Sequence, residues 1–323
     1  HIMALRSIHY PHFPLLFPQK RKNAQLLLYS FRFCRPVLAK RKREWYDRRK
    51  QTGIRPNGAE NGMKIFIFAD IEGISGIFSP EQVVPHGSRF QEGRDFMTAD
   101  INACAEGCKA GGADLVVVRD GHGGSYSVRW EKLSPAVDEV LCGPYGDDRF
   151  EGIDGFDGLI LLGYHAMAGT GAAVLEHSMS SVRIQNYWIN GEKAGETAID
   201  AGIAGEHGVP VILVSGDDKL CAEAGALLPW AETVQVKRGL SSFGAALLPP
   251  DAAHAAIRSR SEQAVRNIRN MQLLRYPSPV RLRAELTERQ PLPNRRSCPG
   301  LTILDGRTFE VEASTLEDAL FRT

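Results

Sequence analysis

The sequence predicts an α/β protein: a mostly parallel, doubly wound sheet with a smaller C-terminal α+β subdomain. Three observations support this prediction. From Met63 onward, short apolar runs alternate with helical stretches, which is typical of parallel βαβ units. The runs are rich in Val, Ile and Leu, as strands buried on both faces are. After Asp218 the pattern changes to one long helix and two strands of alternating polarity, which indicates a smaller mixed subdomain.

Four buried strands are expected in the first part of the chain. They coincide with the apolar runs at 64–70, 113–120, 158–165 and 209–218. Between the first two runs, "MTADINACAEGCKAGG" has helical spacing, with Ile101, Cys104 and Cys108 on one face and two glycines at its end. We therefore expect a helix there, with the two cysteines as thiols of the core.

Alternating segments predict further strands outside these runs. "VRIQNYWING" (182–191) reads as a strand and turn, and it leads into a helix that Glu196 would open. In the last hundred residues we expect a proline-started helix within 246–268 and strands at 278–286 and 307–314. The expected organisation is an α/β catalytic core over 63–220, with 221–323 as a smaller C-terminal subdomain that completes the same unit.

Residues 1–62 differ from the rest of the chain. They carry 14 Lys and Arg against three acidic residues, whereas the remainder of the chain is acidic. Such a segment is typical of a basic nucleic-acid-binding arm or an organelle transit peptide. It lacks a sustained helical or strand period, so we expect a disordered or non-native extension and no nucleic-acid partner.

Composition narrows the class of protein. A chain of 323 residues with 43% hydrophobic residues can bury a sizeable core. No stretch approaches the ~20 apolar residues of a membrane span, so we expect no membrane partner. The six cysteines form no C-x-x-C pair, and a reducing, cytoplasmic location is the expectation.

Polar side chains follow every one of the four buried runs. In open parallel sheets, ligands gather outside the carboxyl ends of the strands, so these side chains should converge on one crevice. The side chains are those of Asp70 and Glu72, Asp120 and His122, His165, and Asp217 and Asp218.

The acid pair after the first run indicates a metal site. Residues i and i+2 of an extended segment point to the same face, so Asp70 and Glu72 can present both carboxylates to one cation. His122 and His165 favour zinc over magnesium or calcium, which prefer oxygen ligands. Because these candidates exceed what one tetrahedral zinc uses, a pair of metals bridged by Asp70 is a further possibility.

The sequence pattern alone leaves the roles of several residues open. Asp217 and Asp218 precede a helical stretch, where acids act as caps, although a role behind the metal site is the other reading. Glu196 is either an acid of a first helical turn or a metal ligand. His177 is not assigned by its neighbours in the sequence.

Five motifs occur in the order of a known family. "ADIEGISG", "DGHGG", "LLGYHAMAG", "EHSM" and "INGEKAGE" resemble the zinc-dependent D-aminopeptidase family of the DppA type, from Met63 to about Leu320. The resemblance implies hydrolysis of the N-terminal peptide bond of short peptides, with preference for D-amino acids such as D-Ala. It also implies a ring-like homo-oligomer, such as a decamer.

The resemblance further implies the roles of particular residues. His177 is the expected catalytic histidine. Phe68 departs from the family pattern, which has Ser at this position, and this puts a hydrogen bond near the site in doubt. Two zinc ions per chain are implied, with Asp70 bridging them, and the implied ligands are Asp70, Glu72, His122, His165 and Glu196.

Two other functions fit part of the pattern. A magnesium-dependent phosphohydrolase also places an acid pair after its first strand, but it would use oxygen ligands, and the sequence has no G-x-x-x-x-G-K-[ST] phosphate loop. A non-catalytic, zinc-stabilised assembly protein would use zinc only to hold the crevice together. Structural zinc sites are usually rich in cysteine, which this set is not.

Overall fold

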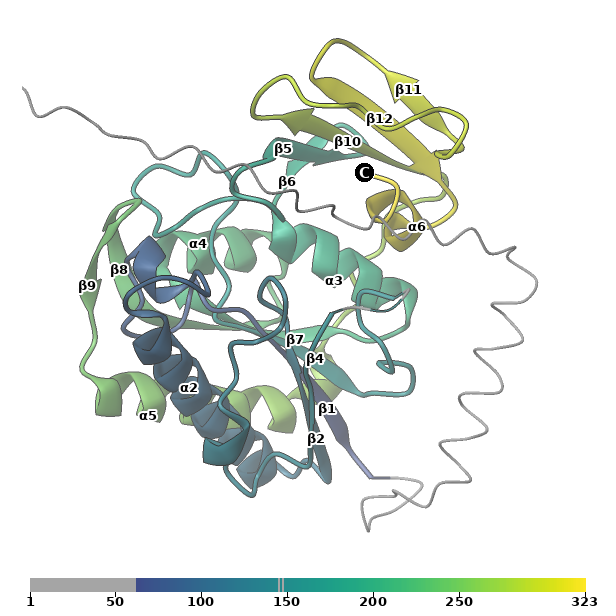
Figure 1. Cartoon of the computed structure of the whole chain (residues 1–323). Helices are drawn as coiled ribbons and strands as arrows, with labels where there is room; N and C mark the ends of the chain where they lie inside the picture. The colour runs from purple at the N-terminus through teal and green to yellow at the C-terminus, as the bar shows by residue number, and fades with distance from the viewer. Residues whose placement is uncertain (1–61, 145, 147) are drawn as a thin grey trace, which may run out of the picture. The chain divides into compact units, whose positions relative to one another are not determined.

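The computed structural model describes residues 62–144, 146 and 148–323 (Figure 1). The expectation of a disordered or non-native extension over 1–62 therefore lies outside the described residues, apart from Gly62. In the described part of the chain no helix combines the length and the apolar character that crossing a bilayer requires.

A seven-stranded sheet forms the centre of the described chain. Its strand order is β3-β2-β1-β4-β7-β8-β9, and every neighbouring pair is parallel except β8 and β9. The expected parallel sheet is thus confirmed, with one antiparallel strand at its edge. The strands are β1 Lys64–Ala69, β2 Leu115–Asp120, β3 Glu139–Leu141, β4 Gly158–Leu162, β7 Val211–Asp217, β8 Glu232–Ser241 and β9 Gly244–Leu247.

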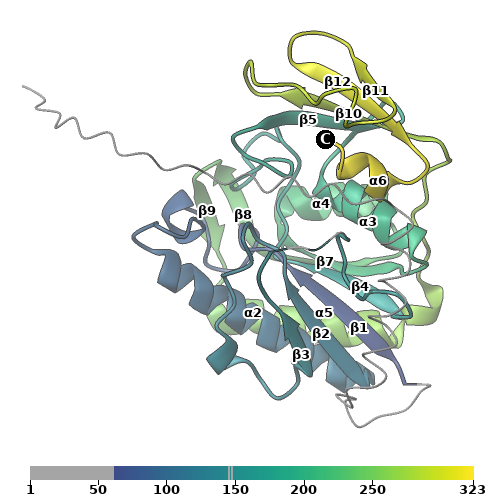
Figure 2. The same ribbon diagram turned by 45° about the vertical axis from the view of Figure 1, so that its right-hand side comes forward.

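Helices cover both faces of this sheet (Figures 1 and 2). Helices α2 (Phe90–Gly111) and α5 (Pro250–Arg266) lie on one face, where they bury Ile65 and Ile67 of β1. Helices α3 (Glu196–Glu206) and α4 (Asp218–Leu227) lie on the other, against Phe66 and Phe68 of the same strand. Alternate residues of β1 therefore enter two different apolar cores, which is why its sequence is apolar throughout.

Three local sequence predictions are confirmed. Helix α2 ends at Gly112, which takes the left-handed conformation (φ 105°) that glycine adopts without strain. Cys104 and Cys108 on this helix are fully buried thiols of the core. Glu196 begins α3, as expected from its position in the sequence.

A second, antiparallel sheet lies beyond α3. Its order is β11-β12-β10-β5-β6, and its inner side chains, such as Tyr187, Leu282 and Phe309, continue the core that contains Phe66. Helix α6 (Leu316–Leu320) packs between α3 and this sheet (Figure 1). The strands are β5 Ile184–Ile189, β6 Glu192–Ala194, β10 Val280–Leu286, β11 Leu301–Ile303 and β12 Thr308–Ala313, and the short 3-10 turns are Pro80–Gln82, Trp130–Lys132 and Ile268–Asn270.

Each sheet draws strands from both sides of residue 220. Strands β8 and β9 extend the parallel sheet, whereas β5 and β6 belong to the antiparallel one. The predicted division of the chain into a catalytic core over 63–220 and a smaller subdomain over 221–323 therefore stays a prediction.

The strand order places a crevice beside β1. From β1 the chain moves outward to β2 and β3, and from β4 it moves the opposite way to β7 and β8. The point of reversal therefore lies between β1 and β4, where the connections that follow the two strands run to opposite sides. Asp70 and Glu72 follow β1, and His165 follows β4, so the predicted residues meet at the position that this topology favours for ligands.

Candidate metal centre

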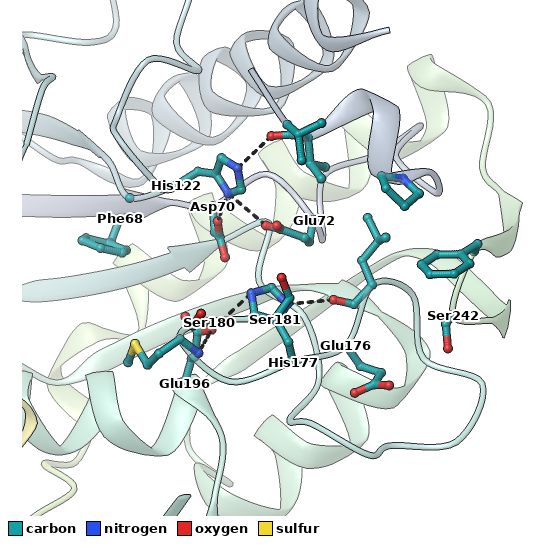
Figure 3. A pocket seen from close by; sticks show the side chains of 18 of the residues that line it. Phe68, Asp70, Glu72, His122, Glu176, His177, Ser180, Ser181, Glu196 and Ser242 are labelled. Atoms are coloured by element: carbon teal, nitrogen blue, oxygen red, sulfur yellow. Dashed lines mark hydrogen bonds and ion pairs between the residues drawn. The ribbon is translucent and has the colours of Figure 1, made fainter. Parts of the chain in front are cut away.

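Three predicted residues form a cluster at the ends of β1 and β2, here called the strand-end group: Asp70, Glu72 and His122. The Nδ1 atom of His122 lies 3.1 Å from Oδ1 of Asp70 and 3.2 Å from Oε2 of Glu72 (Figure 3). Asp120 at the end of β2 shapes the His122 loop, because its carboxylate accepts the backbone N–H groups of Ser127 and Val128. The sequence placed Asp120 at the site, but its contacts are those of a loop anchor.

A close backbone approach joins the strand-end group to β4. Gly73 donates its N–H to the carbonyl of Gly163 at 2.7 Å. A Cβ atom on Gly73 would lie only 1.8 Å from the carbonyl oxygen of Tyr164, so no other residue fits there. The glycine that follows Glu72 thus lets the acid pair lie beside the segment that carries His165.

The other three predicted residues form the loop group: His165, His177 and Glu196. Nε2 of His165 lies 3.3 Å from Oε1 of Glu196, and Nε2 of His177 lies 3.8 Å from the same oxygen. The two imidazole rings are stacked, with centroids 3.9 Å apart and planes at 14°. The loop group therefore brings together residues from the end of β4, the following loop and the start of α3.

Asp70 connects the two groups. Its Oδ1 faces His122 of the strand-end group, and its Oδ2 lies 3.6 Å from Nε2 of His165 in the loop group. Potential ligand atoms of Asp70, Glu72 and His165 lie within 4.8 Å of one another, as do those of His165, His177 and Glu196. The structure thus brings together all six residues predicted for the site.

Each of the three histidines turns one ring nitrogen to a backbone carbonyl and the other to the cluster. Nδ1 of His165 contacts the carbonyl of Ala166 at 3.1 Å, and Nδ1 of His177 contacts that of Leu175 at 2.9 Å. For His122 the carbonyl partner is Val83, 2.9 Å from Nε2. This assigns the N–H of each neutral ring to the carbonyl side and leaves a lone pair facing the carboxylates, as metal-binding histidines commonly do.

Buried atoms in the cluster lack ordinary hydrogen bonds. Within the described residues, Nε2 of His165 and Oε2 of Glu72 are buried without a hydrogen-bond partner of good geometry. The nearest ion-pair contact of Nε2 of His165 is with Glu196 at 3.3 Å, and that of Oε2 of Glu72 is with His122 at 3.2 Å. Leaving such atoms unpaired is costly, and a cation among them removes the cost. The donor set of carboxylate oxygens and imidazole nitrogens fits zinc or a similar transition metal.

Opposite charges dominate the electrostatics of the cluster. Burial opposes ionisation of His165, but Glu196 and Asp70 outweigh it and raise the pKa of His165 to about 10. Burial likewise raises the pKa of Glu196, yet the neighbouring histidines lower it overall to about 2. The pKa of His122 is held well above its ordinary value by Glu72 and Asp70, against the effect of burial. Glu72 and Glu196 therefore stay ionised and favour positive charge among them.

The loop that carries His177 has an unusual backbone. Ala172, Leu175 and Met179 have φ values of 57°, 52° and 62°, which residues with side chains rarely adopt. Two of the carboxylates that anchor it flank His177: Asp217 accepts from the backbone N–H of Val174 at 2.8 Å, and Glu196 accepts from that of Met179 at 2.6 Å. The loop group thus depends on contacts from α3 and β7.

The structure shows what the two acids at the end of β7, Asp217 and Asp218, contact. Asp217 is the N-cap of α4, since its Oδ1 accepts the N–H groups of Lys219 and Leu220. Asp218 begins α4 and accepts from the N–H of Gly239 at 2.9 Å. The capping interpretation from sequence is therefore confirmed for Asp217, which in addition holds the His177 loop.

A pocket of about 740 Å³ opens over the cluster (Figure 3). Phe68, Arg149, Ser180 and Phe243 are among its lining residues. Sequence reasoning missed Arg149, because a single arginine in a long loop has no periodic or motif signal. Phe68 stands where the resembled family has Ser, and its ring packs beneath the guanidinium of Arg149, 4.7 Å from the ring centroid.

Arg149 supports the floor of the site through a buried network. Its guanidinium forms two 2.8 Å hydrogen bonds to the carboxylate of Asp200 on α3, which also accepts from the hydroxyl of Tyr164 at 2.5 Å. Glu196 lies one helical turn before Asp200, with Oε2 3.9 Å from Arg149. This network fixes the first turn of α3, from which Glu196 reaches the loop group.

One known protein family matches almost the whole described part of the chain. The family model described as peptidase M55, D-aminopeptidase, matches residues 63–322. The chain belongs to the D-aminopeptidase family. Family membership confirms the resemblance found in the sequence and the expectation of a metallo-aminopeptidase, and it does not favour a phosphohydrolase or a non-catalytic assembly protein.

Two relatives of the family show how far the similarity extends. The D-aminopeptidase of Bacillus subtilis (strain 168) is 34% identical over 207 residues, which are 64% of this chain and 74% of that protein. The solved structure of the zinc-dependent D-aminopeptidase DppA from Bacillus subtilis, described as a self-compartmentalizing protease, superposes with a TM-score of 0.75 at 29% identity. That match covers 80% of this chain and 95% of DppA, and it confirms the predicted fold class.

Proposed function

We propose that this D-aminopeptidase binds two zinc ions per chain and removes D-amino acids from the N-terminus of short peptides. The observation that carries the proposal is the position of Asp70, whose two oxygens face His122 in one group and His165 in the other. This is the arrangement that a carboxylate shared by two metals needs. The proposed ligands are Asp70, Glu72, His122, His165 and Glu196.

The chain's own residues can serve the reaction in distinct ways. Zinc in such a site activates a water molecule and polarises the carbonyl of the scissile bond. His177 lines the pocket and keeps Nε2 on the side of the cluster, so we assign it the transfer of a proton or the stabilisation of developing charge. Glu72 and Glu196 remain ionised in this buried site, as carboxylates that bind zinc must be.

The substrate and assembly proposals rest on the relatives. Membership of the D-aminopeptidase family supports preference for D-amino acids, with D-Ala as the specific expectation, and the size of the pocket supports short peptides. The description of DppA as self-compartmentalizing supports a ring-like homo-oligomer such as a decamer. The five cysteines in the described residues are free thiols, which supports the cytoplasm as the compartment. All six site residues lie within 63–220, which supports placing the catalytic core there.

The decisive experiment measures metal content together with hydrolysis of D-Ala and L-Ala p-nitroanilides. For the full chain we expect about two zinc ions and D-selective turnover. His177→Ala should lower kcat by about 10²–10⁴-fold, the usual contribution of a positioned acid or base, and should keep its metal. His207→Gln, which changes a histidine outside the pocket, serves as the control.

Other outcomes would replace parts of this proposal. Loss of one zinc in His177→Ala would make His177 a ligand. Activity on a phosphate ester restored by magnesium but not zinc would contradict the peptidase assignment. Bound zinc without turnover on varied short D- and L-peptides would favour an assembly role.

A further inference from the structure

A buried lysine lies behind the acid pair and outside the lining of the pocket. Lys237 on β8 is 1% exposed. Its Nζ donates to the carbonyl oxygens of Glu72, Ile74 and Ile77 at 2.6, 2.9 and 2.8 Å. An ammonium has three protons, so these three acceptors satisfy it completely. All three belong to the loop that begins with the acid pair.

A β-bulge turns this lysine inward. Along β8 the side chains alternate, with Val234 buried, Gln235 exposed and Val236 buried. Lys237 should then face outward, yet it is buried, because the pairing shifts by one residue: Gly216 pairs with Gln235, but Asp217 pairs with Lys237. Bulges often redirect a side chain next to a functional site. Here the bulge brings the ammonium beneath the acid-pair loop.

The strand partner of Lys237 holds the other side of the site. Asp217 accepts the N–H of Val174, three residues before His177. The same loop presses on β8, since a Cβ on Gly239 would lie 2.1 Å from the carbonyl oxygen of Ala172. Neighbouring residues of β7 and β8 thus contact the two loops that carry the acid pair and His177.

We propose that Lys237 and Asp217 are a positioning pair that sets the spacing between the acid-pair loop and the His177 loop. This inference rests on the proposed metal site, and it adds the elements that keep its two sides in register. Lys237 acts on the backbone that places Asp70 and Glu72, and Asp217 acts on the backbone that places His177. Neither side chain needs to touch metal or substrate.

The alternative is that Lys237 only stabilises the fold, and cobalt binding distinguishes the two. Lys237→Met keeps an unbranched side chain that is one atom shorter and removes all three donors. We expect the affinity of the metal-free protein for Co²⁺ to fall by about 10–100-fold, the usual cost of losing a group that supports metal ligands. The visible absorption bands of the bound Co²⁺ should also shift, because the carboxylates change position.

Lys109→Met is the matched control. Its Nζ also donates to a backbone carbonyl, that of Asp114, and to Asp138, but at the opposite end of β2. Its Co²⁺ affinity and spectrum should equal those of the unsubstituted protein. If Lys237→Met has a lower melting temperature and yet binds Co²⁺ with unchanged affinity and spectrum, Lys237 is structural and the inference is wrong.

A second variant keeps the inference testable if Lys237→Met does not fold. Asp217→Asn retains an oxygen to cap α4 but replaces the one that accepts from Val174 with an amide that donates. We expect kcat on D-Ala p-nitroanilide to fall about tenfold or more, with Co²⁺ affinity close to that of the unsubstituted protein. Unchanged kcat would overturn the part of the inference that concerns Asp217. If the unsubstituted protein binds no metal, the proposed function fails and this inference fails with it.

Discussion

The two groups of the metal centre are built in different ways. The strand-end group (Asp70, Glu72, His122) follows directly from two adjacent parallel strands, so the register of β1 and β2 brings its members together. The loop group (His165, His177, Glu196) spans a long loop and a hairpin, and its backbone contains residues with positive φ. The first group rests on regular strand pairing, with Asp120 and Lys237 holding the loops that follow the strands, whereas the second depends throughout on side-chain anchors such as those from β7 and α3.

Asp70→Asn should have the largest effect, because Asp70 belongs to one group and faces the other. Loss of its charge removes the carboxylate that both metals would share, so we expect both zinc ions to be lost. Turnover should fall more than about 100-fold, because losing a residue that only supports metal ligands already costs about 10–100-fold. Zinc per chain and hydrolysis of D-Ala p-nitroanilide measure this. Asp138→Asn, at the far end of β2, is the control. Retention of both ions in Asp70→Asn would show that the groups bind metal independently.

Glu196→Gln should show whether the two groups bind metal independently. The amide oxygen can still accept from the N–H of Met179, so the loop keeps its anchor, but the negative charge beside His165 is lost. We expect about one zinc per chain to remain, in the strand-end group, and turnover to fall about 10–100-fold. Metal titration followed by calorimetry resolves the two sites. Simultaneous loss of both ions would mean that the groups bind metal as one unit.

Gly121→Ala tests the packing beneath the strand-end group. A Cβ at Gly121 would lie 2.3 Å from the ring of Phe68, so His122 beside it must shift. We expect a loss of about 1–3 kcal/mol in the free energy of unfolding, as for other overpacked sites. Phe68→Ser should itself be destabilising, because it removes a buried ring, but the additional cost of Gly121→Ala should be smaller in that background, which urea denaturation of the two single variants and the double variant measures.

Gly225→Ala is the matched control for that substitution. Its Cβ would meet no atom within 4 Å on α4, and alanine should stabilise this helix by about 0.5–1 kcal/mol. If Gly121→Ala were equally stabilising, the contact with Phe68 would not restrict position 121.

The smallest expected effect concerns the far end of α3. Glu317 and Asp154, acting against partial burial, raise the pKa of His207 to about 9. A pKa above the ordinary value near 6.5 means that protonation favours the folded state, so this stabilisation is complete below pH ~6.5 and is lost as pH rises through 9.

Thermal melting at pH 6 and pH 9.5 measures this effect. The difference in melting temperature between the unsubstituted protein and His207→Gln should be a few degrees at pH 6 and close to zero at pH 9.5. A difference that is the same at both pH values would contradict the assigned role of the His207 charge.

Local patterns predicted the strand-end group well, for a physical reason. Four apolar runs identified the central strands, and chemistry at the ends of parallel strands converges whatever the rest of the fold is. Asp70, Glu72, His122 and His165 could therefore be found from the sequence. For His177 and Glu196 the pattern left the role open, and only the resemblance to a family singled them out.

Other features depend on contacts between distant parts of the chain. "VRIQNYWING" predicted β5, but nothing local indicates that β5 pairs with β10, roughly a hundred residues later. Lys237 occupies a position that simple alternation predicts to be exposed, and only the bulge against β7 explains its burial. The pairing of Arg149 with Asp200 likewise joins two segments without a shared motif.

Between His177 and Glu196 the chain forms strands β5 and β6 of the second sheet, and this bears on when the site is completed during synthesis. Strands β5 and β6 form a small hairpin, and an isolated hairpin is at best marginally stable in water. Its main partner, β10, ends at Leu286, so the hairpin gains stable pairing only after most of the chain has left the ribosome. Until then the start of α3 has the network of Arg149, Asp200 and Tyr164 but lacks the contacts with α6 and β6 on the side of the second sheet. We therefore expect a nascent D-aminopeptidase of this kind to acquire its hydrolytic activity late, once β10 has paired with the hairpin.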